Sequence, residues 1–175
     1  GIQPDLVTFA KGVSSGYAPL GGVLVGKRVR APFWDEPVPG AVFRHGYTYS
    51  GHAASAAAAT ANLDIIERED LIGRVRAMTP VLDRALRCLE GAPLVGEIRT
   101  AGLTGAVAIR ADLLAADPAL PDKVAAASIR HGVATRSIRG HAIQLSPAFV
   151  VTEAELEAMV AGFGRALDEV ATTVR

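Results

Sequence analysis

The chain has 175 residues, half of them hydrophobic, which is enough material for one or two folded domains with a buried core. Its 18 Lys+Arg residues balance 18 Asp+Glu residues, so the charge argues against nucleic acid or an anionic membrane surface as the natural partner. No apolar run approaches the roughly 20 residues that a membrane-spanning helix needs. A small molecule or another protein chain is therefore the expected partner.

The only cysteine, Cys88, excludes an internal disulfide. It follows Leu86 in a helix-like segment, so we expect an inert, half-buried thiol in a reducing compartment. No basic stretch followed by an apolar one resembles a signal peptide. These features predict a cytoplasmic protein.

The first half of the chain predicts two strands, a loop and a helix. The runs 5–10 and 22–25 are apolar on both faces, which is typical of strands that helices cover on both sides. Segment 32–49 mixes Pro, Gly and aromatic residues and is expected to be an irregular loop with a functional role. Ser50 is expected to cap an alanine-rich helix over residues 52–68.

A second helix is predicted over residues 71–89, where Thr79-Pro80 either starts a new helix or kinks a continuous one. After Pro93 the pattern changes to short strands. The predicted strands are 94–100, 103–110, 133–136 and 142–145, and a helix over residues 122–131 lies among them.

The last helix is the best-marked element of the sequence. Thr152 and Glu155 have the spacing of a capping box. Apolar residues then fall on one stripe at helical spacing. The stripe consists of Leu156, Met159, Val160, Phe163, Leu167 and Val170.

Lys11 lies where the first predicted strand ends and a loop of small residues, GVSSG, begins. A partly dry setting favours the neutral amine, which is a nucleophile toward carbonyl carbons. The alternative is a lysine that extends its ammonium group to the surface, and position alone does not decide between the two. The glycine and Lys-Ser/Thr spacing of a nucleotide-binding P-loop is missing.

Four blocks of the sequence carry a further signal. The first block is PDLVTFAKGVSSGYAPLGGVLVGKRV and the second is HGYTYSGHAASAAAATANLDIIE. The third and fourth are VGEIRTAGL and GVATRSIRGHAIQLSPAFVVTEAELEAMV. In this order the blocks resemble the class III aminotransferases, the omega-amino-acid and amine transaminases among the fold type I pyridoxal-phosphate enzymes. The resemblance covers nearly the whole chain.

The resemblance implies a role for three residues. Lys11 matches the lysine that binds the aldehyde of pyridoxal 5'-phosphate as an imine and then carries the proton of the reaction. Thr48 matches the threonine that binds the cofactor phosphate of the neighbouring subunit, which implies a homodimer. Arg136 matches the arginine that pairs with the substrate carboxylate.

The residues alone leave alternatives for two of these positions. Thr48 would equally serve to cap the helix that follows it. Arg136 would equally form a surface salt bridge, with Arg139 as the mobile arginine. Arg99, His45, His52 and His141 are interpreted as structural, and the histidines do not have the spacing of a metal site.

The expected fold is α/β, namely the C-terminal part of a fold type I transferase. Residues 1–92 are expected to form the end of the large-domain sheet that binds the cofactor, and residues 93–175 a small C-terminal α+β domain. The family's glycine loop, its ring-stacking aromatic residue and its aspartate would precede Lys11, so we expect a C-terminal fragment of a longer protein.

The expected function is transfer of an amino group from an omega-amino acid or amine to an oxo acid such as pyruvate. Two alternatives remain. One is the decarboxylase, racemase or aminomutase chemistry of relatives that share the lysine segment. The other is a non-catalytic truncated fragment that needs a partner chain to fold, because such a fragment exposes apolar surface.

Overall fold

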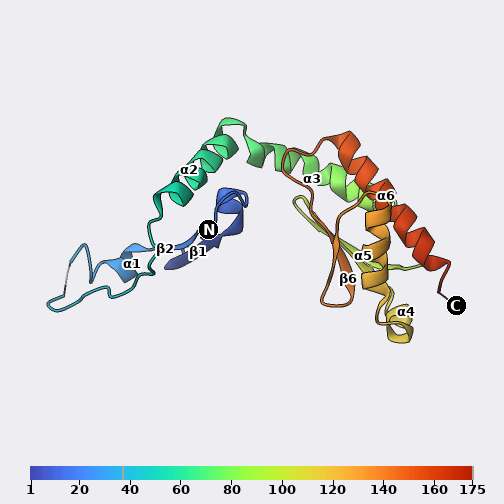
Figure 1. Cartoon of the computed structure of the whole chain (residues 1–175), viewed down its shortest axis with the longest axis horizontal. Coiled ribbons are helices and arrows are strands. Elements are labelled where there is room, and N and C mark those ends of the chain that lie inside the picture. Colours follow the sequence, from blue (N-terminus) through green and yellow to red (C-terminus); the bar gives the residue numbers. More distant parts are fainter. Residues whose placement is uncertain (37, 175) are drawn as a thin grey trace. The chain divides into compact units, whose positions relative to one another are not determined.

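The computed structural model describes residues 1–36 and 38–174. The chain divides into two compact units, Gly1–Glu69 and Asp70–Arg175 (Figure 1). Residues 70–92 group with the second unit because the helix they form packs on the last helix and on two strands of that unit. The assignment of 1–92 and 93–175 as the functional domains of the family stays a prediction.

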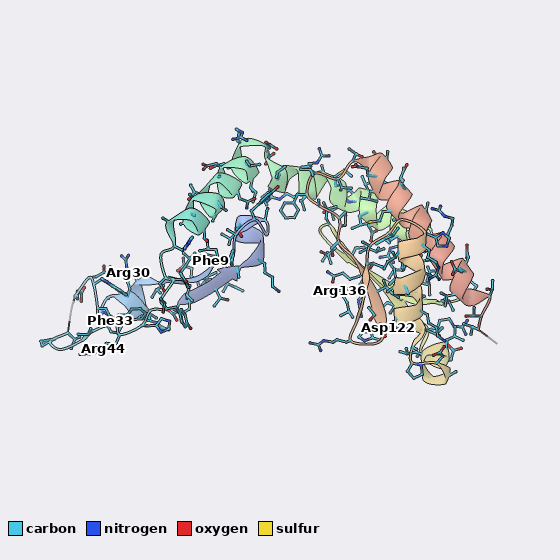
Figure 2. All side chains as sticks on the ribbon, viewed as in Figure 1. Phe9, Arg30, Phe33, Arg44, Asp122 and Arg136 are labelled. Atoms are coloured by element: carbon cyan, nitrogen blue, oxygen red, sulfur yellow. The ribbon has the colours of Figure 1, made fainter. Side chains whose placement is uncertain are left out.

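The first unit holds a two-stranded antiparallel sheet and one long helix. Its elements are β1 (Leu6–Ala10), the 3-10 helix η1 (Lys11–Ser14), β2 (Gly21–Val25), α1 (Lys27–Arg30) and α2 (Ala53–Arg68). Phe9 pairs with Gly22 across the strands, and a Cβ at Gly22 would lie 2.5 Å from Cζ of that ring. A side chain at residue 22 would therefore displace the ring of Phe9, which Figure 2 labels on this sheet.

The prediction that helices bury both faces of these strands is wrong within this unit. All five residues of β1 are exposed, Leu6 to 53%, and Leu24 on β2 is exposed to 61%. The physical reason is that α2 packs mainly on η1 rather than across the strands. An apolar strand pattern predicts that the faces of the strand are buried. It does not specify which part of the protein packs on them.

The helix over 52–68 is confirmed as α2, but its cap is not Ser50. His52 occupies the cap position, and its Nδ1 accepts a hydrogen bond from the Ser55 amide at 3.2 Å. The Ser50 hydroxyl instead accepts one from the Tyr47 amide at 2.8 Å and closes the preceding turn. Segment 32–49 is irregular as predicted, although the short helix α1 before it was not predicted and Pro37 lies outside the described residues.

The second unit is a four-stranded antiparallel sheet with helices on one face (Figure 1). Its strands, in the order β3-β4-β6-β5, are β3 (Val95–Ala101), β4 (Thr104–Ile109), β6 (Ala142–Leu145) and β5 (Arg136–Ile138). Its helices are α3 (Leu71–Arg87), α4 (Ala111–Ala116), α5 (Leu120–Arg130) and α6 (Glu153–Ala171). From residue 93 onward the chain has both strands and helices, as the sequence predicts, whereas α3 comes from the stretch that was expected to belong to the first domain.

The hydrophobic core of the second unit lies between the sheet and the helices α3, α5 and α6. The predicted capping box at Thr152 and Glu155 is present at the start of α6. The apolar stripe of α6 faces this core, and Met159 is the one stripe residue that is only partly buried. The core residues buried beyond 99% include Leu82, Leu86, Val107, Leu120, Val124, Ile143, Leu156 and Phe163.

Three local predictions change in the second unit. α3 continues through Pro80, so no new helix begins at Thr79. The strand predicted over 133–136 begins only at Arg136, because Val133 is buried and its amide bonds to the Ser128 carbonyl at the end of α5. The Cys88 thiol is exposed rather than half-buried.

Among the residues that the structure describes, no helix combines the length and the apolar composition that crossing a membrane requires.

Candidate active site

Lys11 follows β1 directly and begins η1. The β1–β2 ladder fixes the chain up to Ala10, which pairs with Gly21. Lys11 then takes a φ of +53°, in the left-handed region, and its side chain is exposed. This backbone conformation costs a residue other than glycine roughly 1 kcal/mol or more, so other contacts must hold it. Strain of this kind is common at functional positions.

A buried serine of the segment after Lys11 helps to hold that segment in place. Ser14 is 2% exposed, and its hydroxyl donates to the Ala18 carbonyl at 2.5 Å. Ser15 and Gly16 also have positive φ, so the chain reverses within a few residues. A Cβ at Gly12 or Gly16 would have no described atom within 4 Å, which leaves open space beside the lysine.

Asn62 is a site residue that the sequence interpretation missed. It lies on α2, and its side-chain amide bonds to the segment that follows Lys11. The sequence does hold a sign of its role. Asparagine is a weak helix former, and here it lies inside an alanine-rich helix.

Thr48 lies in the turn that precedes α2, and its side chain is exposed. The alternative that Thr48 caps α2 is wrong, because His52 caps that helix. Within residues 1–36 and 38–174 no hydrogen bond of the Thr48 hydroxyl is present. The hydroxyl is therefore available to a ligand or a partner chain.

Aromatic side chains organise the segment that leads to Thr48. The rings of Trp34 and Phe43 have centroids 5.4 Å apart, those of Phe43 and His45 5.8 Å, and those of His45 and Tyr47 5.2 Å. All three pairs are tilted or edge-to-face, which is the favourable geometry for aromatic rings. Tyr47 also lines a hollow with Pro19 and Leu20 of the loop that follows Lys11, so the two segments meet there.

Arg136 belongs to the second unit and begins β5. It pairs across the sheet with Gln144, whose Oε1 accepts hydrogen bonds from Nε at 3.3 Å and Nη2 at 3.2 Å of the guanidinium group. The Gln144 amide in turn donates to the Ser146 hydroxyl at 2.7 Å. Because this partner amide is neutral, it orients the guanidinium group without balancing its charge.

Arg136 also faces away from the helices. Ser137, the next residue, bonds to Asp122 on α5, and side chains alternate along a strand. Figure 2 labels Arg136 and Asp122 on opposite sides of the sheet. Arg136 lines a hollow of about 410 Å³ together with Gln144 and Ser146, which is wide enough for a small carboxylate.

Arg99 and His52, two of the residues interpreted as structural, have structural partners. Arg99 pairs with Glu97 at 3.0 Å, and His52 caps α2. Arg139, the alternative mobile arginine, has a φ of +50° in the tight turn between β5 and β6. The described part of the chain holds no cluster of three or more His, Cys, Asp or Glu residues that would bind a metal ion.

The residues present fit the cofactor that the lysine segment implies. A primary amine at Lys11 suits an aldehyde, and a free hydroxyl at Thr48 suits a phosphate. The open space beside Gly12 and Gly16 leaves room for a ring. Lys11 and Thr48 belong to the first unit and Arg136 to the second.

Comparison with known proteins identifies the fold and the family of this chain. An (S)-enantioselective omega-transaminase from Thermomicrobium roseum is similar with a TM-score of 0.86 and 37% identity, over 97% of this chain and 38% of that one. The chain therefore has the mixed α/β fold of part of a transaminase. A family model described as Aminotransferase class-III matches residues 1–167, and the chain belongs to this family.

Two curated proteins that are similar to this chain are also aminotransferases. Gamma aminobutyrate transaminase 3, chloroplastic, of Solanum lycopersicum is 33% identical over 96% of this chain and 33% of its own length. Taurine--pyruvate aminotransferase of Bilophila wadsworthia is 35% identical over 97% of this chain and 40% of its own length. The chain thus spans between a third and two-fifths of the length of these relatives.

Proposed function

We propose that this chain forms part of a pyridoxal-phosphate-dependent aminotransferase, with Lys11 as the lysine that binds the cofactor. The observation that carries the proposal is the placement of Lys11. It is an exposed amine at the end of a strand, in a left-handed conformation that its neighbours hold, beside open space. Family membership supports the same reaction class.

Each of the three residues has a defined task in this proposal. Pyridoxal phosphate, when bound, would supply an electron sink for negative charge at the substrate carbon. The Lys11 amine would hold the cofactor through its aldehyde and, as a free amine, would move a proton at the substrate carbon as a general base. The Thr48 hydroxyl donates to the phosphate, and the Arg136 guanidinium binds a substrate carboxylate through two parallel hydrogen bonds.

The proposed reaction moves an amino group from an omega-amino acid or amine to an oxo acid such as pyruvate. The names of the relatives support it, since one is a gamma aminobutyrate transaminase and another a taurine--pyruvate aminotransferase. Both names denote transamination, which favours this reaction over decarboxylation, racemisation or an aminomutase reaction. Arg136 suits the oxo acid because its charge is not balanced by Gln144.

We further propose a homodimer in which Thr48 serves the cofactor of the partner subunit. Large apolar side chains on either side of Thr48 are exposed, Tyr47 to 77% and Tyr49 to 81%, and aromatic residues of this kind are enriched at protein interfaces.

The exposed thiol of Cys88, the only cysteine, suits a reducing compartment such as the cytoplasm.

The transfer of isotopic nitrogen tests the proposed function. The protein is incubated with pyridoxal phosphate, pyruvate and γ-aminobutyrate labelled with nitrogen-15, and labelled alanine is measured by mass spectrometry. We expect labelled alanine above the level without protein, and none above that level for Lys11→Ala. The same yield from the wild type, from Lys11→Ala and without protein would contradict the proposal.

A further inference from the structure

We propose that Asn62 is a positioning residue for Lys11: its side-chain amide fixes the backbone of residues 12–15 and so holds the lysine in its left-handed conformation. The inference rests on the proposed function for the role of Lys11. The contacts that carry it lie within the first unit and do not depend on the cofactor.

Asn62 uses the whole hydrogen-bonding capacity of its amide nitrogen on this segment. Its Nδ2 donates to the Gly12 carbonyl at 3.0 Å and to the Val13 carbonyl at 3.1 Å. Its Oδ1 accepts a hydrogen bond from the Ser15 hydroxyl at 2.7 Å. One side chain from α2 therefore contacts three of the four residues that follow Lys11.

Lys11 is thereby held from both sides along the chain. Before it, Ala10 is fixed by its pairing with Gly21. After it, Gly12 is fixed by Asn62. The backbone of Lys11 must join these two fixed points, and its positive φ follows from that constraint rather than from any preference of lysine.

The hydrogen bonds of the Asn62 amide, rather than its bulk, are the feature that the proposal requires. Asn62→Asp has nearly the same shape and keeps the acceptor for Ser15, but it loses both donors and places a carboxylate against two carbonyl oxygens. Asn62→Ala removes all three hydrogen bonds. Thr60→Ala is the matched control, because the Thr60 hydroxyl bonds to the Ala56 carbonyl of its own helix and, among the described residues, to no part of the segment after Lys11.

The first experiment measures backbone order in the intact chain without cofactor. The amides of Ser15 and Tyr17 bond to carbonyls within the segment, at 3.3 and 3.0 Å, and their hydrogen exchange reports its order. We expect exchange at both amides to be about tenfold faster or more in Asn62→Ala and Asn62→Asp. Thr60→Ala should exchange like the wild type.

The second experiment measures the lysine itself. The protein is titrated with pyridoxal phosphate, reduced with borohydride, and the labelled fraction of each lysine is mapped; the lysines are Lys11, Lys27 and Lys123. We expect the concentration that half-labels Lys11 to rise about tenfold in both Asn62 variants. Labelling of the other two lysines should not change, which separates positioning from general unfolding.

Exchange and Lys11 labelling that are the same in Asn62→Asp as in the wild type would overturn the inference. A wild type that carries no label on Lys11 would instead contradict the proposed function, and the exchange experiment would still decide whether Asn62 fixes the segment. An equal rise in the half-labelling concentration of all three lysines in both Asn62 variants would also overturn a positioning role, because the effect would not be specific to Lys11.

Discussion

At the scale of single residues, neutral partners hold one candidate functional group in each of the two units. Lys11 is fixed through backbone contacts on either side of it, and Arg136 is oriented by the amide of Gln144. In neither case does the contact itself balance the charge. The roles proposed for the two groups, an amine that reacts and a guanidinium group that binds an anion, both require this arrangement.

The role proposed for Arg136 predicts a selective loss when it is replaced. For the proposed transamination, Arg136→Ala should raise the KM for pyruvate by roughly ten- to a hundredfold, because charge-assisted hydrogen bonds contribute about 1.5–3 kcal/mol. Cofactor labelling at Lys11 should change little. Steady-state kinetics and the borohydride reaction measure the two effects.

Arg99→Ala is the control for this prediction. Arg99 lies in the same row of the sheet, since it pairs with Ala106, which pairs with Gln144, which pairs with Arg136. Its partner is Glu97, so its replacement should leave the KM for pyruvate unchanged. Equal losses of pyruvate use and of cofactor labelling in Arg136→Ala would identify a structural arginine instead.

At the scale of elements, the second unit depends on close contact between α6 and the end of α5. A Cβ at Gly162 on α6 would lie 2.7 Å from the His131 carbonyl oxygen and 2.8 Å from Cγ2 of Val133. The first of these is a backbone atom, so a side chain at Gly162 would force the helices apart. Gly164 differs, since its nearest neighbour is the flexible end of Leu89 at 3.2 Å.

These two glycines form a matched pair for a stability test. Gly162→Ala should lower the free energy of unfolding by about 1–3 kcal/mol, because overpacking at a close backbone contact has that cost. Gly164→Ala should be neutral or stabilising by up to about 1 kcal/mol, the gain in helix propensity. Urea unfolding measures both, and equal effects would contradict the packing argument.

Glu169 adds a pH-dependent contact between the same two helices. Its carboxylate accepts hydrogen bonds from Arg130 and from His131, the latter at 2.9 Å, and these bonds lower its pKa below the usual range, Arg130 having the larger effect. A lowered pKa in the folded state stabilises the fold above the pKa of the unfolded chain. That stabilisation is lost as the pH falls through the pKa of the folded state.

We therefore expect Glu169→Gln to be less stable than the wild type at about pH 7 and to approach it at about pH 3. Urea unfolding at several pH values measures this difference. Glu157→Gln, at an exposed position of the same helix, corrects for the change in net charge. A difference between Glu169→Gln and the wild type that is independent of pH would show that the hydrogen bonds do not depend on the carboxylate charge.

At the scale of the whole molecule, the two units differ in how much apolar surface they bury. The main hydrophobic cluster lies entirely in the second unit. In the first unit Ala59 is the buried hydrophobic residue among those described, whereas aromatic and aliphatic side chains around Thr48 and on both strands are exposed. Surface of this kind is expected to be covered by another chain segment or by a second subunit.

The proposed homodimer predicts a measurable mass. Light scattering coupled to gel filtration should give twice the 18.1 kDa of one chain at high concentration. Tyr49→Asp should weaken the association at least about tenfold, since buried aromatic residues at interfaces contribute about 2 kcal/mol or more. Phe149→Asp is the control, as Phe149 is exposed to 44% but lies in the second unit. A mass of one chain at every concentration would contradict the dimer.

Features that depend on residues close together in the sequence were predicted correctly. The capping box at Thr152, the apolar stripe of α6 and the position of Lys11 at a strand end are local patterns, and the structure has all three. The contacts of Asn62 and Gln144 were not predicted, because Asn62 bonds to residues about 50 positions away and Gln144 depends on strand register. The exposure of the β1 strand was mispredicted because burial depends on what packs there, which an apolar run does not specify.

The measurement that tests the central claim most directly is the map of borohydride-reduced pyridoxal phosphate on the lysines of the chain. We expect the label on Lys11 at cofactor concentrations that leave Lys27 and Lys123 unlabelled, and its disappearance in Lys11→Ala. Equal labelling of all three lysines, or label that avoids Lys11, would contradict the claim that Lys11 binds the cofactor.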